Sequence, residues 1–239
     1  MNQEYQRLLK RYERKFTPVI YRAIKEQIDE YLKTRSLDSI KQDPILQALD
    51  KLYVESGSAW AFRVDKEIRR QLNLPRIGTG FSRQIAKLIR DQYRVDMLNM
   101  SKEITDTTKK RIRNILIEGV DSSLTVDETA KLIQENGVTQ ARARVIARTE
   151  TVKAANGAAL ANAEDKGYVY QKQWFAVMDK RTRHDHRKLD GQTIDKEDAF
   201  SIVDKNGITQ RMRYPGDDSL GASPAEVINC RCSMLLIAK

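Results

Sequence analysis

Apolar residues recur at intervals of three and four through the first two thirds of the chain, which is the spacing of amphipathic helices. Thr17-Pro18 pairs an N-cap residue with a proline at the first helical position, so we predict two helices in the opening stretch. Asp43-Pro44 repeats this signal and predicts the start of another helix. Segment 74–80 contains one proline and two glycines and predicts the clearest break, after which a further amphipathic helix begins.

Two more helices are predicted between residues 125 and 166. Thr125 and Glu128 form a capping box, and Gly137 offers a stop in the left-handed conformation. Thr139 then begins a helix that carries Arg148-Thr149-Glu150. We expect this charged group to support the architecture of the protein rather than chemistry.

After residue 167 the spacing of apolar residues changes from the helical period to a period of two, which is typical of strands. Residues 168–177 are rich in strand-forming side chains, and Asn206-Gly207 is the signal of a tight hairpin within residues 202–209. The segment that contains Cys230 and Cys232 leads into a closing strand, which leaves residues 179–191 as a loop that projects from the sheet. The sequence therefore predicts an α+β fold, with a predominantly helical N-terminal region and a C-terminal domain built from a long helix and a small antiparallel sheet.

The charge of the chain points to an anionic partner. The formal net charge is +10 and the pI is near 9.5. Arg83, Lys87, Arg90 and Arg94 are spaced to form one stripe along a helix, and such a stripe can follow the phosphates of duplex DNA without sequence preference. The alternative is that the stripe is an ordinary solvated helix face.

The composition, 40% hydrophobic and 32% charged residues, is that of a soluble protein. A run of about 18 apolar residues, the length that spans a bilayer, is missing from the sequence. The charged opening stretch does not resemble a signal peptide. We therefore expect a cytosolic protein with no membrane partner.

Every cysteine and every histidine of the chain falls in two short C-terminal clusters. Cys230 and Cys232 are two residues apart, as are His184 and His186, and these residue types are the ones that hold zinc. A zinc-bound imidazole needs a partner for its second nitrogen, and Asp185 or Asp190 could supply one. A single zinc site is one interpretation of this pattern.

The two cysteines also allow a plainer interpretation. The spacing matches no standard zinc finger, and both thiols could be small buried hydrophobic groups on a core strand, with His186 a hydrogen-bonded loop residue. A disulfide between them is disfavoured, because extended residues two apart place their β-carbons about 6–7 Å apart, whereas a disulfide needs about 3.5–4.5 Å. Bound metal or two free thiols remain.

The C-terminal half, from about residue 139 to 237, resembles the phage Mu F-like head morphogenesis family of minor head proteins. The resemblance rests on the order of several short motifs along one chain. They are Arg148-Thr149-Glu150, Trp174, Asp179 with Arg181-Thr182-Arg183, His186, Leu189-Asp190-Gly191, Tyr214-Pro215-Gly216 and Asn229-Cys230-Arg231-Cys232.

The resemblance implies a metal site made by His186, Cys230 and Cys232. His184 falls where the family tolerates other residues, so Asp179 or Asp190 is the alternative fourth ligand. The resemblance also implies a minor head protein of a phage, made in the host cytoplasm, incorporated in the head interior, and associated with the portal protein, other head proteins and DNA. Arg181 and Arg183 are then further candidate DNA contacts, unless they pair with acidic residues inside the domain.

In this interpretation residues 1–120 form a helical docking and DNA-facing region, and residues 121–239 form the Mu F-like domain. Ile20, Ile24, Ile28 and Leu32 lie on one helical face and could dock on a partner, or they could pack on the protein's own helices. The competing function is a metal-dependent nuclease that uses the histidines and nearby aspartates. The sequence lacks a recognisable catalytic frame around these residues, so we expect that the protein is not an enzyme.

Overall fold

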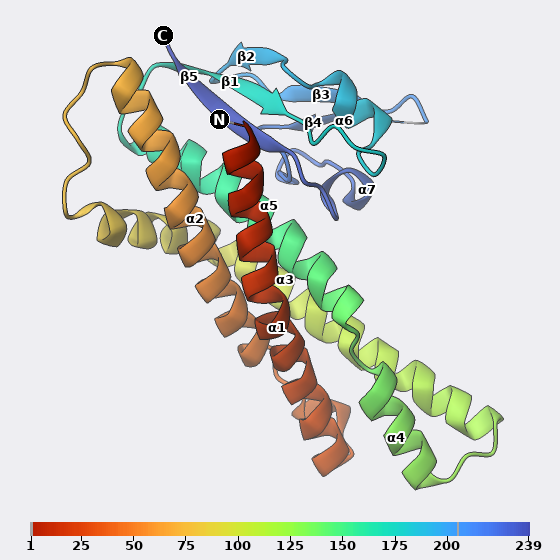
Figure 1. Ribbon diagram of the computed structural model, residues 1–239. Helices are drawn as coiled ribbons and strands as arrows, with labels where there is room; N and C mark the ends of the chain where they lie inside the picture. The colour runs from red at the N-terminus through yellow and green to blue at the C-terminus, as the bar shows by residue number, and fades with distance from the viewer. Residues whose placement is uncertain (1, 205) are drawn as a thin grey trace.

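The computed structural model describes residues 2–204 and 206–239 and shows a bundle of long helices with small β-sheets at one end (Figure 1). The long helices are α1 (Asn2–Thr34), α2 (Asp43–Gln71), α3 (Phe81–Asp121) and α5 (Gln140–Asp165), with the shorter α4 (Val126–Asn136) and the 3-10 turn η1 (Leu37–Ser39) between them. The C-terminal end contains β1 (Tyr170–Phe175), α6 (His184–Lys188), β2 (Thr193–Asp195), β3 (Phe200–Val203), β4 (Thr209–Met212), α7 (Pro224–Val227) and β5 (Ser233–Ala238). The predicted α+β class is confirmed.

The prediction of two helices around Thr17-Pro18 is wrong, because α1 continues through Pro18 without a break. Proline removes one backbone hydrogen bond, but packing on both sides of it keeps the helix whole. Phe16 and Ile20, which flank Pro18, are fully buried, and the hydroxyl of Thr17 donates to the carbonyl of Glu13 at 2.7 Å. Tertiary burial outweighs the local signal here.

The apolar face of α1 belongs to the protein's own core. Ile20, Ile24 and Ile28 are at most 1% exposed, and Leu32 packs against the same cluster. Docking of this face on a partner is therefore ruled out, and the alternative, packing on the protein's own helices, is what the structure has. Removal of residues up to 37 would open this core rather than free a docking segment.

The other helix signals agree with the structure, with one exception. Helix α2 begins at Asp43, the break at residues 72–80 separates α2 from α3, and both parts of the Thr125–Glu128 capping box are formed. Gly137 is not a left-handed stop, since its φ is −61° and its ψ is −35°. A β-carbon at Gly137 would lie 2.5 Å from the carbonyl oxygen of Ile133 and 2.7 Å from Cδ1 of Ile28, so a larger residue there would require the backbone to shift.

Helix α5 is the central element, with α1 and α2 packed along it. Residues 149–163 of α5 are all buried, and small side chains let the neighbouring backbones approach closely. A β-carbon at Gly57 of α2 would come within 3.0 Å of the β-carbon of Ala158 and 3.2 Å of the carbonyl of Ala154. The small-residue segment of α5 therefore fixes how α2 lies against it.

The predicted antiparallel sheet is present, as two pieces. The first has the strand order β2-β1-β5, with Trp174 opposite Met234 and Lys172 opposite Leu236 in the β1–β5 register. The second is the hairpin of β3 and β4, which pairs Val203 with Thr209. Its connection is longer than the tight turn that Asn206-Gly207 predicts, and Lys205 within it lies outside the described residues.

The edge of β5 that does not pair with β1 is covered by side chains from the helices. The amide of Met234 donates to Oδ1 of Asn156 on α5 at 2.9 Å, and the amide of Ala238 donates to Oε1 of Gln71 on α2 at 2.8 Å. These bonds attach the sheet to the helical bundle and satisfy backbone groups that would otherwise need water.

Candidate metal centre

Two segments bring His186, Cys230 and Cys232 together. His186 lies on α6, a short helix inside the region that the sequence predicted to be only a loop, so that prediction is corrected. The cysteines lie in the extended segment between α7 and β5 rather than on the strand itself. Asn229, with a φ of +66°, turns the chain at the end of α7 and directs it into this segment.

The motif Arg148-Thr149-Glu150 holds the start of the cysteine segment in place. Nη1 of Arg148 donates to Oδ1 of Asn229 at 2.5 Å, and the amide of Asn229 donates to the hydroxyl of Thr149 at 2.8 Å. Arg148 also donates twice to Glu13 of α1, at 2.8 and 2.9 Å. Glu150 has a different partner, since it accepts the hydroxyl of Tyr53 on α2 at 2.7 Å. The architectural role expected for the motif agrees with these contacts.

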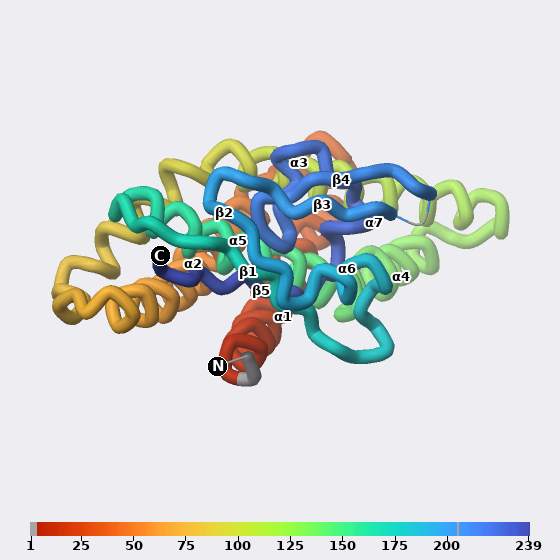
Figure 2. The backbone as a smooth tube through the Cα atoms, turned by 90° about the horizontal axis from the view of Figure 1, so that it is seen from above, coloured from red at the N-terminus to blue at the C-terminus, as the bar shows by residue number. Residues whose placement is uncertain are grey.

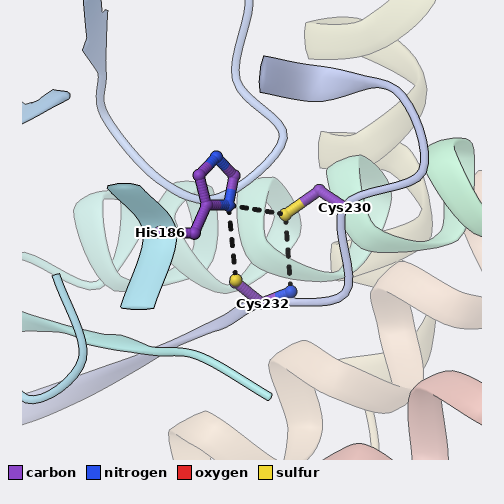
Figure 3. Close-up of side chains that lie close together, drawn as sticks. All are labelled: His186, Cys230 and Cys232. Atoms are coloured by element: carbon purple, nitrogen blue, oxygen red, sulfur yellow. Dashed lines mark hydrogen bonds between the residues drawn. The ribbon is translucent and has the colours of Figure 1, made fainter. Parts of the chain in front are cut away.

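The three side chains converge on one point (Figure 3). Nδ1 of His186 lies 3.6 Å from Sγ of Cys230 and 3.5 Å from Sγ of Cys232. The amide of Cys232 donates to Sγ of Cys230 at 3.4 Å. All three residues are at most 2% exposed, and both thiols are free.

The second nitrogen of His186 contacts a buried carboxylate. Nε2 lies 3.0 Å from Oε2 of Glu226 on α7, which is 5% exposed. Burial, with the nearby charge of Asp185, raises the pKa of Glu226. A hydrogen bond from Nε2 to this carboxylate fixes the ring orientation and leaves Nδ1 directed at the two sulfur atoms.

The electrostatics of the cluster favour a thiolate at Cys230. A hydrogen bond from Cys232 and the charge of His186 hold the pKa of Cys230 well below its ordinary range, although burial opposes this. The interaction with Cys230, together with burial, raises the pKa of Cys232. Burial disfavours a charged His186, but the hydrogen bond and charge of Cys230 outweigh burial and raise the pKa of His186. Thiolate is the form of cysteine that binds metal.

The three donors match three of the four positions of a tetrahedral zinc site. A tetrahedral ion with Zn–S near 2.3 Å and Zn–N near 2.0 Å places its sulfur and nitrogen ligands about 3.5 Å apart. The two S···N distances here are 3.5 and 3.6 Å, and the three candidate ligand atoms lie within 4.8 Å of one another. The His186–Glu226 contact supplies the carboxylate that commonly supports a zinc-bound histidine.

The other sequence candidates for the metal lie outside this cluster. His184 and Asp190 are exposed, and Oδ1 of Asp190 accepts the amide of Ala176. Asp179 is held by Arg231 through bonds of 2.5 and 2.6 Å, and that guanidinium keeps the pKa of Asp179 well below its usual range. Asp185 accepts the amide of His186 and lies near Glu226 rather than near the thiols.

Sequence reasoning missed Glu226 as the partner of His186 and expected Asp185 or Asp190 instead. The available signal was Ser223-Pro224, a helix start that places Glu226 on a short helix just before the cysteine segment. The chain has 33 acidic residues, so this signal alone could not single out Glu226.

The candidate DNA contacts are divided between two regions. Arg83, Lys87, Arg90 and Arg94 are all exposed along α3, where Arg90 donates to Asp50 at 2.8 and 3.0 Å. Arg181 is exposed in the loop before α6, and Arg183 donates to the carbonyl of Ile228 at 2.7 Å. The stripe and the loop therefore do not form one continuous set.

Comparison with known proteins identifies a family over the second half of the chain. The family model described as phage Mu protein F like protein matches residues 110–235, which run from the second half of α3 into β5. The chain belongs to this family. The match includes His186, Glu226, Cys230 and Cys232 of the candidate site, and it confirms the resemblance stated from the sequence.

Two relatives cover most of this Mu F-like chain. Minor head protein GP7 of Bacillus phage SPP1 is 26% identical over 221 residues, 85% of this chain and 67% of that protein. NAD(+)–arginine ADP-ribosyltransferase EFV of Enterococcus faecalis is 25% identical over 235 residues, 77% of this chain and 47% of that protein. The chain thus spans about half the length of the second relative.

No solved structure matches the chain. Among the described residues, no helix combines the length and the apolar character needed to cross a bilayer.

Proposed function

We propose that the protein is a phage minor head protein that is incorporated during head morphogenesis. The observation that carries this proposal is the similarity to minor head protein GP7 over 85% of the chain, more than the region that the family model matches. In this proposal the protein is made in the host cytoplasm and resides in the virion, inside the head. Its partners are the portal protein, other head proteins and double-stranded DNA.

Within this proposal residues 1–120 supply the docking and DNA-facing region, and residues 121–239 form the head morphogenesis domain. The exposed cations of α3 support the DNA-facing part, because exposed arginine and lysine on one helix attract phosphates. Helix α5 of the second region packs on α1 and α2 of the first. This packing supports the view that the two regions form one folded unit.

We further propose that the His186, Cys230 and Cys232 cluster holds structural zinc. An ion there would join α6 to the segment that leads into β5, and zinc in such a site contributes directly to folding free energy. The burial of all three ligands supports a structural rather than a catalytic role, because a substrate would have to reach the ion.

We propose that the protein is not an enzyme. A metal-dependent nuclease would need metal ligands open to DNA, whereas His186 is buried and exposed His184 lies outside the cluster. The activity named for the Enterococcus relative is not transferred, because this chain matches less than half of that protein.

The test is to purify heads from cells in which the phage assembles and to quantify this chain by mass spectrometry. We expect a few copies per head, retained after treatment with nuclease and high salt. Heads that lack the chain while the chain is present in the lysate would contradict the proposal.

A further inference from the structure

One side of the molecule presents cations whose acidic neighbours are already engaged. Arg7, Lys10 and Arg14 are exposed on the first half of α1, and among the described residues none of them has an ion-pair partner. The nearby carboxylates pair elsewhere, Glu4 with Arg63 and Glu13 with Arg148. The positive charge of this helix face is therefore left for something outside the chain.

The loop between β1 and α6 extends this surface. Nε2 of Gln6 donates to the carbonyl of Arg231 at 3.5 Å, and Arg231 in turn binds Asp179 of the loop. Lys10 lies between Gln6 and Glu13 on the same face of α1, because residues spaced by three and four share a helix face. Figure 2 shows the loop and α1 projecting on the same side of the molecule.

The loop contributes both charge and apolar surface. Its residues Lys180 and Arg181 are exposed, and the pairing of Asp179 with Arg231 leaves Arg181 only a distant contact of 3.8 Å to that carboxylate. Met178, the residue before Asp179, is 65% exposed. Methionine and arginine are enriched at protein interfaces, and an exposed methionine among cations fits a protein partner better than a phosphate backbone.

The helix that carries the α3 stripe lies on the other side of the molecule. In Figure 2, the N-terminal end of α1 and the first half of α3 lie on opposite sides, with α2 and α5 between them. A straight duplex that follows the α3 stripe cannot also lie along α1. If α3 faces DNA, as the proposed function has it, the α1 side is free for a different partner.

We propose that Arg7, Lys10, Arg14, Lys180 and Arg181, with Met178 among them, form a docking surface for an acidic face of another head protein. This inference rests on the proposed function and identifies the surface that would bind the other head protein. Opposite charges steer the encounter and fix its orientation, and Met178 supplies an apolar contact. The apolar face of α1 is thus turned to the protein's own core, and its charged face to the partner.

The experiment compares two triple variants of equal charge in assembling heads. Arg7→Glu/Lys10→Glu/Arg14→Glu reverses the α1 face, and Lys110→Glu/Arg113→Glu/Lys131→Glu reverses three exposed cations at the far end of α3 and on α4. All six side chains are exposed, so both variants should melt within a few degrees of the unaltered chain. Copy number per head is measured by mass spectrometry, and affinity for a DNA duplex of about 30 base pairs by fluorescence anisotropy.

We expect the α1 variant to enter heads about tenfold less than the control variant, with equal affinity of the two variants for the duplex. Met178→Asp alone should also lower incorporation and leave DNA binding unchanged. Equal incorporation of the two triple variants would overturn the docking surface. A duplex affinity lower for the α1 variant than for the control would assign the surface to DNA instead. Absence of the unaltered chain from heads would overturn the proposed function itself.

Discussion

His186 uses both nitrogens of its ring, one toward two sulfur atoms and one toward Glu226. This arrangement gives His184 and His186, two residues apart in the sequence, different expected roles. Only His186 reaches the thiols, because α6 turns the side chains of neighbouring residues in different directions. The contrast between the two histidines provides an internal control for the proposed zinc site.

Protein purified without a metal-chelating tag should contain about one zinc per chain, measured by elemental analysis. His186→Ala and Cys232→Ser should lose the ion and melt at lower temperature, whereas His184→Ala should retain both zinc and melting temperature. Glu226→Gln should keep the fold but bind zinc about 10- to 100-fold more weakly, since it removes the carboxylate that supports the ligand. Metal-free protein whose melting temperature does not respond to chelation would rule out structural zinc.

Glu150 is a second residue with a measurable consequence. Its carboxylate is buried and accepts the hydroxyl of Tyr53 at 2.7 Å, and burial raises the pKa of Glu150 to about 7. An unfolded glutamate titrates near 4.3. Between these two pH values the folded chain holds a proton that the unfolded chain has released, so the free energy of unfolding falls as pH rises through this window.

Glu150→Gln cannot ionise and should lose this dependence. The difference in free energy of unfolding between wild type and variant, measured by urea titration, should change by about 3 kcal/mol between pH 4.5 and 7.5, in favour of the variant at high pH. Exposed Glu103→Gln serves as the matched control and should follow wild type throughout. Parallel curves for wild type and Glu150→Gln would contradict the buried-acid explanation.

The proximity of His186, Cys230 and Cys232 could be anticipated because cysteine and histidine are so few in this chain, whereas metal binding there stays a prediction. The chain has two cysteines and two histidines, so few combinations of these residues can form a site. Glu226 could not be predicted in this way, since its role depends on where α7 lies against α6. The sequence contains no local pattern that pairs residue 186 with residue 226.

At the scale of elements, α3 carries the candidate DNA stripe along its exposed face. Arg83, Lys87 and Arg94 are exposed, while Arg90 is engaged by Asp50 of α2. Among the described residues, the structure thus separates the four residues of the stripe into three cations without an ion-pair partner and one, Arg90, that is paired with Asp50. Sequence periodicity alone treats the four as equivalent.

The triple variant Arg83→Gln/Lys87→Gln/Arg94→Gln should weaken duplex binding and flatten the plot of log affinity against log salt. The slope should fall by roughly 0.9 for each lost phosphate contact. Arg90→Gln alone should change the slope least, because its guanidinium is held by Asp50. Fluorescence anisotropy with duplexes of unrelated sequence measures both the affinity and the salt slope. An unchanged slope in the triple variant would show that these residues form an ordinary solvated helix face.

The helix starts at Asp43 and Thr125 were predicted correctly, whereas the start predicted at Thr17-Pro18 was wrong. The Thr125–Glu128 box and the start at Asp43 depend on neighbouring residues only, so local sequence reports them. The continuity of α1 through Pro18 accompanies the burial of Phe16 and Ile20, which is decided by tertiary packing, as is the close approach of Ile28 to Gly137. Local sequence signals fail to predict a helix boundary where tertiary burial determines it.

At the scale of the whole molecule, the α+β class could be predicted from the change of period after residue 167. The central position of α5 could not be predicted, because an alanine-rich segment shows little amphipathic pattern. Its small side chains instead allow α1 and α2 to approach from different sides, as the contact between Gly57 and Ala158 illustrates. The division of the chain at residue 120 stays a prediction, since sequence resemblance and not packing defines it.

The covered edge of β5 affects how copies of the protein can associate with one another. An open strand edge is a template on which identical chains can add strand to strand, and the risk grows with local concentration. Asn156 and Gln71 occupy amides of Met234 and Ala238 that another chain would use. The two side chains that attach the sheet to the helices therefore also leave these amides unavailable for pairing with a strand of another chain.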